Sequence, residues 1–120
     1  MNIKTILSLN IIVFILLMMS CVSSLPKSQL DFGIEAAQNG LWEESIFRWE
    51  KVLQSDPNSA AAHNNLAVAY EKKGNFEKAE IEYKKALQLS PKNEQIQYNY
   101  EQFKKNIGKS EKEEEINEKK

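Results

Sequence analysis

Cys21 and His63 are the side chains most suited to chemistry, because the sequence contains a single cysteine and a single histidine. One cysteine cannot form an internal disulfide, and one cysteine with one histidine offers too few ligands for an ordinary zinc site. No motif surrounds the histidine, so no Ser-His-Asp arrangement can be assembled, and the sequence holds no glycine-rich phosphate loop. Pairs of carboxylates are inevitable among 17 acidic residues and carry no information. We therefore predict no enzyme, no cofactor and no metal site.

The composition narrows the class of protein further. The 16 Lys and Arg residues nearly balance the 17 Asp and Glu residues, so no strong field attracts nucleic acid, and we expect no such partner. Ala, Leu, Glu, Lys and Gln are abundant, whereas the chain has three prolines and four glycines, which favours helices. The first twenty or so of the 120 residues do not resemble a folded domain. We therefore expect one small all-α domain of about ninety residues.

Cys21 follows an apolar segment at the start of the chain. Residues 1–4 are weakly basic, and residues 6–19 are apolar except for Ser8 and Asn10. This layout is typical of a secretory signal. The uninterrupted apolar run at residues 11–19 has nine residues, well short of the roughly 20 that cross a bilayer. We therefore favour a cleaved signal over a permanent transmembrane helix.

The residues at the end of the apolar segment are Leu17, Met18, Met19, Ser20 and Cys21. They resemble the lipobox of bacterial lipoproteins, at which the precursor is acylated and cut. Ser20 fits the pattern, whereas Met18 and Met19 stand where the pattern prefers Leu and a small residue.

This resemblance implies how the chain is anchored. Residues 1–20 form the signal peptide, Cys21 carries the lipid, and residues 21–25 form a tether. Two or more acyl chains give lasting attachment, since each buried CH₂ contributes about 0.8 kcal/mol. Val22 stands where an Asp would retain a lipoprotein in the inner membrane, which implies the outer membrane. An uncleaved anchor, and plain secretion with Cys21 as an incidental thiol, are the alternatives.

The rest of the chain repeats itself at an offset of 34 residues. The aligned residues are Gly40 with Gly74, Trp42 with Phe76, Glu43 with Glu77, Trp49 with Tyr83, Lys51 with Lys85, Leu53 with Leu87, Gln54 with Gln88 and Pro57 with Pro91. A period of 34 residues is that of the tetratricopeptide repeat. The chain resembles this family in two units, residues 26–59 and residues 60–93, which implies a solenoid of helix-turn-helix repeats.

The second unit carries the family pattern more fully than the first. Its residues in signature places are Leu66, Ala67, Tyr70, Gly74, Phe76, Ala79, Tyr83, Ala86, Leu89 and Pro91. His63 stands where the family favours Trp, so we expect a histidine on the packing side of its helix. The first unit has Ser45 where the family favours Ala, and it is the more divergent copy.

Physical rules predict the helices of both units without the resemblance. We expect them at residues 28–39, 41–55, 60–73 and 76–89. Gly40 and Gly74 fall at the turns between paired helices, where a left-handed backbone is needed. Small alanines permit close helix contact, aromatic rings fill the space between pairs, and Pro57 and Pro91 separate one helix from the next.

Residues 94–107 are predicted to form a helix that caps the second repeat. Its apolar residues are Ile96, Tyr100, Phe103 and Ile107. They lie four, three and four residues apart, which places them in one stripe along a helix. The following residues, 108–120, include nine charged side chains and are predicted to be disordered. The alternative is an extended cap helix, because runs of Glu and Lys form solvated helices.

In the family that the chain resembles, partners lie along the concave face, which the first helix of each pair forms. By this spacing the partner-binding residues are Leu30, Ile34, Asn64, Asn65, Val68, Lys72, Tyr98 and Asn99. The resemblance implies that Asn65 and Asn99 grip a peptide backbone through donor and acceptor; solvation or a bond to a neighbouring helix is the alternative. Leu30 and Gln95 stand where lysines would bind an acidic tail, so a partly apolar segment is the expected ligand.

Two functions agree with these features. The leading hypothesis is a membrane-tethered scaffold or assembly factor that holds a peptide or a subunit of an envelope complex in the concave groove. The alternative is an oligomeric ligand-handling accessory of an envelope transporter, which requires self-association because two repeats form a shallow groove. Two repeats are also near the lower limit of stability, in which case Trp42 and Trp49 would lie at a partner interface.

Overall fold

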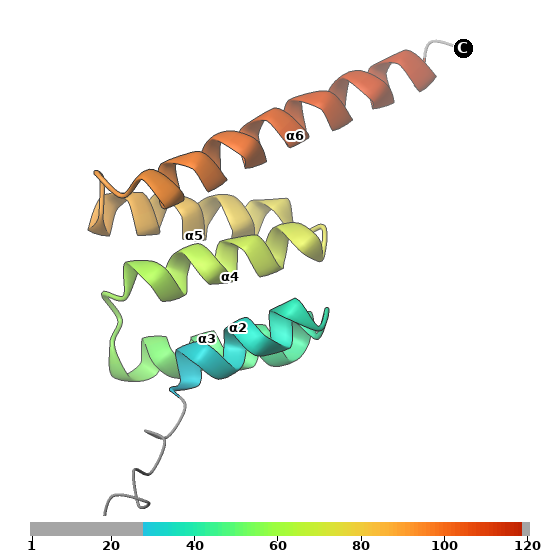
Figure 1. The fold of residues 1–120 in the computed structure, drawn as a ribbon. Coiled ribbons are helices and arrows are strands. Elements are labelled where there is room, and N and C mark those ends of the chain that lie inside the picture. Colours follow the sequence, from blue (N-terminus) through green and yellow to red (C-terminus); the bar gives the residue numbers. More distant parts are fainter. Residues whose placement is uncertain (1–27, 119–120) are drawn as a thin grey trace, which may run out of the picture.

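The fold is built from helices. The computed structural model describes residues 28–118, and in this range the chain forms five α-helices and no strand (Figure 1). The helices are α2 (Gln29–Gln38), α3 (Trp42–Ser55), α4 (Ala60–Lys72), α5 (Phe76–Leu89) and α6 (Glu94–Glu118). The predicted all-α solenoid is therefore confirmed. The predicted signal peptide, the tether and Cys21 lie outside the described residues.

Local sequence sets the ends of the helices. Ser28 forms a capping box with Asp31, and Ser59 and Asn75 each accept a hydrogen bond from the backbone N–H three residues later. Gly40 and Gly74 have φ angles of 73° and 75°, and no other described residue has a positive φ. Each repeat thus turns back at the predicted glycine, and the first four helices agree with their predicted bounds to within one residue.

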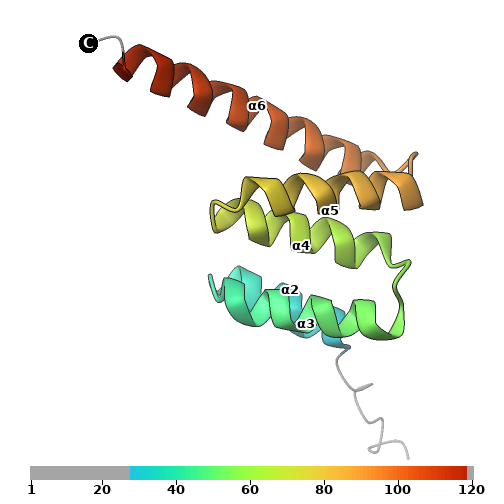
Figure 2. The same cartoon turned by 180° about the vertical axis from the view of Figure 1, so that it is seen from behind.

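The helices are stacked side by side in chain order. α2 packs on α3, α3 on α4 and α4 on α5, while α6 covers α5 and also reaches α4 (Figures 1 and 2). The α2–α3 pair forms one end of the stack and α6 forms the other. One end is therefore covered by an additional helix, and the other is not covered by any described residue.

Two apolar clusters hold the stack together. The first consists of Ile46, Trp49, Leu66 and Ala69, and the second of Ala67, Ala79, Tyr83 and Phe103. Tyr70 packs against both clusters. Ala67 and Ala79 are fully buried, and the rings of Tyr83 and Phe103 pack with their centroids 5.2 Å apart. The aromatic positions 49 and 83 are thus equivalent in successive repeats, as the 34-residue period predicts.

A polar link supports the second cluster. Tyr83 Oη donates a hydrogen bond to Glu71 Oε2 at 3.0 Å, and Asn106 Nδ2 donates to Glu71 Oε1 at 3.2 Å. One carboxylate of α4 therefore joins α5 and α6. Burial of the phenol, followed by the charge of Glu71 and its hydrogen bond, raises the pKa of Tyr83 well above its ordinary value.

The end of the chain differs from the predicted disordered tail. The capping stripe is present, with Ile96 and Phe103 buried and Tyr100 and Ile107 half-buried, but α6 does not end at Ile107. It runs through Gly108 to Glu118 and projects past α5 (Figure 1). Glycine costs a helix only about 1 kcal/mol relative to alanine, and the Glu and Lys residues that follow are good helix formers. Despite the length of α6, no helix in the described range is apolar enough to span a bilayer.

Candidate functional site

A hollow of about 480 Å³ lies on the side of the stack formed by the first helix of each pair. Its lining residues are Ile34, Ala37 and Gln38 from α2, Trp42 and Trp49 from α3, Asn64, Asn65 and Val68 from α4, and Gln95 and Asn99 from α6. α5 contributes none of them. We call this hollow the groove.

The polar wall of the groove is a chain of amides. Gln95 Nε2 donates to Asn99 Oδ1 at 3.0 Å, and Asn99 Nδ2 donates to Asn64 Oδ1 at 3.1 Å. Asn64 Nδ2 in turn donates to Asn65 Oδ1 at 3.3 Å. Because every bond runs in the same direction, Asn65 Nδ2 and Gln95 Oε1 are left at the two ends without a partner among the described residues. The wall therefore offers an unpaired NH2 group at its α4 end and an unpaired carbonyl oxygen at its α6 end.

The rest of the lining, from α2, α3 and Val68 of α4, is apolar apart from Gln38. Ile34 is 39% exposed and stands on α2, one helical turn before Ala37 and Gln38. Val68 and Trp42 are half-buried, so part of each side chain faces the groove. None of the described lining residues carries a charge. The groove is therefore suited to an uncharged segment that combines an apolar side chain with backbone amide groups.

The structure brings five of the predicted partner-binding residues together. Those that line the groove are Ile34, Asn64, Asn65, Val68 and Asn99, whereas Leu30, Lys72 and Tyr98 do not. Leu30 packs on the first apolar cluster, and its carbonyl accepts a hydrogen bond from Trp49 Nε1 at 3.2 Å. Tyr98 is 61% exposed, but consecutive residues point about 100° apart around a helix, so it does not share the direction of Asn99.

The two predicted gripping asparagines differ in what they can still bind. In Asn99 the amide nitrogen and the carbonyl oxygen each make one hydrogen bond within the amide chain, which joins α6 to α4. Asn65 uses only its acceptor, so its Nδ2 is available to a ligand. The equivalent positions therefore have different hydrogen-bonding states, which the repeat pattern does not predict.

Four other described residues line the groove beyond the concave-face set that the spacing predicts. They are Ala37, Gln38, Trp42 and Trp49. Ala37 and Gln38 lie three and four residues after Ile34, so helical spacing contains the signal that would have found them. The sequence assigns Trp42 and Trp49 to packing between pairs, which is also true of the structure. Each of these large rings contacts both the core and the groove. The 34-residue period alone does not show which residues contact both.

His63 is held by structural hydrogen bonds. The side chain is buried, with Nδ1 2.5 Å from Glu82 Oε2 and Nε2 2.9 Å from the carbonyl oxygen of Pro57. The ring thus joins α4 to α5 and to the loop before α4, and neither nitrogen is left for a substrate. The predicted core position is confirmed. Among the described residues, no group of three His, Cys, Asp or Glu side chains is placed to hold a metal ion.

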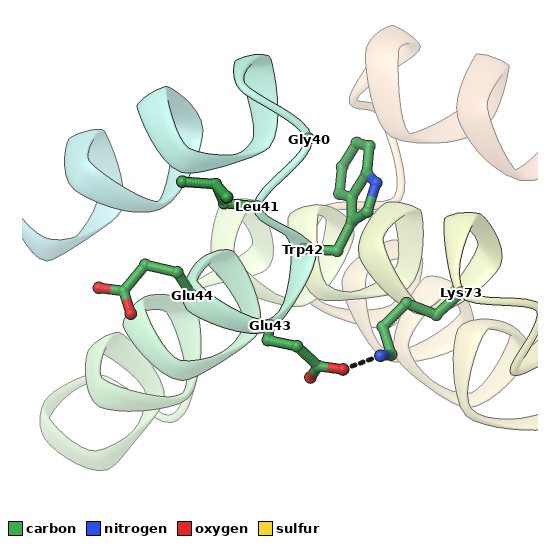
Figure 3. A pocket seen from close by; sticks show the side chains of 6 residues that line it. All are labelled: Gly40, Leu41, Trp42, Glu43, Glu44 and Lys73. Atoms are coloured by element: carbon green, nitrogen blue, oxygen red, sulfur yellow. Dashed lines mark hydrogen bonds and ion pairs between the residues drawn. The ribbon is translucent and has the colours of Figure 1, made fainter.

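A second hollow, of about 660 Å³, lies at the turn between α2 and α3 and is larger than the groove. Its lining residues are Gly40, Leu41, Trp42, Glu43, Glu44 and Lys73 (Figure 3). Figure 3 shows Glu43 turned toward Lys73, with which it forms an ion pair, while Leu41 and Glu44 point to the other side of α3. Five of the six lining residues are consecutive in the sequence, and the Glu43 carboxylate and the Lys73 ammonium group neutralise each other. We therefore favour the groove, in which polar groups converge from separate helices.

Comparison with known families agrees with this architecture. The sequence pattern of the tetratricopeptide repeat matches residues 30–94, which is more than half of the chain. The chain is a tetratricopeptide-repeat protein. Repeats of this family generally bind other proteins through extended concave surfaces and generally perform no catalysis, and the groove of this repeat protein lies on the corresponding side.

Two curated proteins are similar to this repeat protein over part of their length. The Type IV pilus assembly protein PilF of Pseudomonas aeruginosa is 34% identical over 74 residues, which cover 62% of this chain and 29% of that protein. Sperm-associated antigen 1 of Rattus norvegicus is 26% identical over 93 residues, which cover 73% of this chain and 10% of that protein. The chain therefore spans less than a third of either relative.

Proposed function

We propose that this repeat protein is a membrane-tethered scaffold that holds a peptide, or a subunit of a cell-envelope complex, in the groove. The observation that carries the proposal is the groove itself, which combines an uncharged apolar wall with an amide chain that ends in the unpartnered Asn65 Nδ2. Such a surface binds through shape and backbone hydrogen bonds and offers no group for catalysis.

The partner is an extended segment with an apolar side chain. A backbone carbonyl of the segment accepts from Asn65 Nδ2, and a backbone N–H donates to Gln95 Oε1, so the existing amide chain stays intact. An apolar side chain of the same segment packs against Ile34 and Val68. Because the amides are already ordered by one another, binding costs little additional side-chain entropy.

The membrane tether belongs to the same proposal. Removal of residues 1–20 leaves Cys21 as the lipid-bearing first residue, and residues 21–25 connect it to the repeat domain. Two points support this part: the resemblance of the residues before Cys21 to a lipobox, and the similarity to a protein whose name assigns it to type IV pilus assembly. By the same resemblance, Val22 favours the outer membrane as the site of attachment.

Photocrosslinking from inside the groove tests the proposal. A photoreactive amino acid replaces Ile34 in the full-length protein in its own membrane, and a matched variant carries it at Ile81 on α5, which is 55% exposed and lines no described hollow. We expect one crosslinked envelope protein from position 34 and none of it from position 81. In a second arm without the photoreactive residue, the tagged full-length protein with Ile34→Glu should no longer co-purify with that envelope protein, whereas Ile81→Glu should leave co-purification unchanged.

Two outcomes would contradict the scaffold. Equal crosslinking from both positions would show that the groove is not the binding surface. Crosslinking of position 34 to a second copy of this chain alone would replace the scaffold with the oligomeric alternative. Separately, recovery of the unchanged protein in the soluble fraction, with Cys21 free, would refute the lipid tether and leave the groove untouched.

A further inference from the structure

A lysine stands one helical turn beyond the groove on α4. Asn65, Val68 and Lys72 follow one another at steps of three and four residues, so they share one face of this helix. Asn65 and Val68 line the groove, whereas Lys72 lies outside it, is exposed, and belongs to the last turn of the helix. A segment that leaves the groove along α4 in this direction therefore meets a cation.

The charge of Lys72 is not neutralised within the described part of the chain. Its ammonium group makes no ion pair or hydrogen bond with a residue of this range. The preceding residue, Glu71, already accepts hydrogen bonds from α5 and α6, and the following residue, Lys73, pairs with Glu43. A carboxylate of a ligand can therefore pair with Lys72 without breaking a contact that the described fold uses.

The 34-residue period places two uncharged side chains at the positions equivalent to Lys72. They are Gln38 on α2 and Asn106 on α6. Gln38 lines the groove, and Asn106 Nδ2 donates to Glu71 Oε1 at 3.2 Å. Lys72 is thus the charged member of this set of three, so an acidic group that follows the groove is attracted to α4.

The distance between Val68 and Lys72 sets the spacing within the ligand. Four residues of an α-helix advance by about 6 Å. In an extended segment, side chains two positions apart face the same side and lie about 7 Å apart. When an apolar side chain of the segment packs on Val68, the residue two positions away therefore lies beside Lys72.

We propose that the segment bound in the groove carries an acidic residue two positions from its apolar side chain, and that this acidic residue pairs with Lys72. This inference rests on the proposed use of the groove as a peptide-binding surface, and it does not depend on the membrane tether. The uncharged groove accepts many apolar segments, and the ion pair with Lys72 selects among them.

Labelled peptides and a reversal of charge test the inference on the full-length protein in detergent micelles. Each fluorescein-labelled peptide consists of serines with one Leu and one Glu, which stand one, two or three positions apart in either order. Companion peptides carry Gln or Lys in place of Glu. Fluorescence anisotropy measures their binding to the unchanged protein, to Lys72→Glu and to the matched control Lys85→Glu. Lys85 is exposed on α5, has no partner among the described residues and lines no described hollow.

The expected result is a preference that depends on both spacing and charge. In one of the two orders, the peptide with Leu and Glu two positions apart should bind about two- to fivefold more tightly than its Gln counterpart, which is the range of an exposed ion pair. Lys72→Glu should reverse this preference in favour of the Lys peptide, and Lys85→Glu should leave it unchanged. Added salt should weaken the preference in the unchanged protein.

Different failures are distinguishable. Equal binding of the Glu and Gln peptides, with both weakened by Ile34→Glu, would refute the role of Lys72 and leave the groove intact. The absence of any binding that depends on Leu would remove the groove, and this inference with it. A preference for Glu that ignores its spacing, or that persists in Lys72→Glu, would assign the effect to overall charge.

Lys72 also has a structural alternative, because a cation in the last turn of a helix is stabilised by the helix dipole. Thermal unfolding of Lys72→Glu followed by circular dichroism measures that role. Lower stability with an unchanged peptide preference would overturn the inference. Recovery of binding by the Lys peptide would support it, because a purely structural role does not change which peptide charge is preferred.

Discussion

Gly33 shows how closely single residues control the first repeat. A Cβ atom at this position would lie 2.2 Å from Trp49 Nε1, since the indole packs directly on the backbone of α2 and donates a hydrogen bond to the carbonyl of Leu30. No L-residue with a side chain fits there without displacing the largest ring of the first cluster. The glycine is therefore required by packing and not by backbone conformation.

The substitution Gly33→Ala should destabilise the protein. Alanine improves helix propensity by about 1 kcal/mol, but the overpacking against Trp49 costs typically 1–3 kcal/mol, so we expect a net loss. Gly108→Ala is the matched control, because Gly108 is also helical and an added Cβ would meet nothing within 4 Å. The control should gain up to about 1 kcal/mol. Urea unfolding followed by circular dichroism measures both changes. If Gly33→Ala were more stable than the unchanged protein, the Trp49 ring would have to move aside at little cost.

Tyr83 should make the protein sensitive to alkali. Its folded-state pKa is raised by burial first and by Glu71 second, so the folded protein favours the protonated phenol more than the unfolded chain does. This contribution to stability is complete below pH about 10, the ordinary pKa of tyrosine, and is lost as the pH rises above it.

Comparison with Tyr83→Phe isolates this effect. At neutral pH the variant should be less stable by about 1 kcal/mol, because the hydrogen bond to Glu71 is lost. Above pH about 10 the difference should shrink and then reverse, because phenylalanine does not ionise. Free energies of unfolding measured by urea titration at each pH test this, and a difference that stays constant to high pH would contradict the assigned cause.

At the scale of elements, α6 combines a packed part with a projecting part. Phe103 is buried against Tyr83, and Asn106 bonds to Glu71, while the described packing of the helix on the apolar clusters ends at Ile107. Cap and extension are thus one helix with two different energetic roles.

Shortening α6 should separate these roles. A chain that ends at Lys109 keeps every described packing contact of the helix, so its free energy of unfolding should stay within about 1 kcal/mol of the full chain. Phe103→Ala, by contrast, should cost about 3–5 kcal/mol, because it removes a fully buried ring. Thermal unfolding followed by circular dichroism measures both. A large loss in the shortened chain would mean that the extension itself supports the fold.

At the scale of the whole molecule, the two clusters form a continuous core. Tyr70 packs on both, and α3 packs on α4 between the repeats. Trp49 belongs to the first cluster and Trp42 packs against it, whereas the helices are spread over the whole stack. Tryptophan fluorescence therefore reports the first repeat, and circular dichroism reports the entire described fold.

The two signals should change together on unfolding. Because the clusters share Tyr70 and the α3–α4 contact, we expect one cooperative transition with the same midpoint by fluorescence and by circular dichroism. The measurement is a single urea titration of the full chain with both probes. A fluorescence transition at a lower urea concentration than the loss of helix would show that the first repeat is only marginally stable when no partner protein is bound.

Sequence alone determined the features that depend on neighbours along the chain. The 34-residue period, the glycine turns, the bounds of the first four helices, the capping stripe and the burial of His63 all follow from local spacing and residue type. Each of these features belongs to a repeated or periodic pattern, so several residues support each prediction.

Only the tertiary structure decided which residues meet across helices. Asn64 and Asn99 are 35 residues apart, and their hydrogen bond depends on the angle and distance at which α6 crosses α4. The same packing turns Leu30 into the core and leaves Asn65 with a free donor. A repeat pattern places residues on a helix face, but small differences in helix packing decide which of them touch. The composition of the groove therefore emerged only when the helices were stacked.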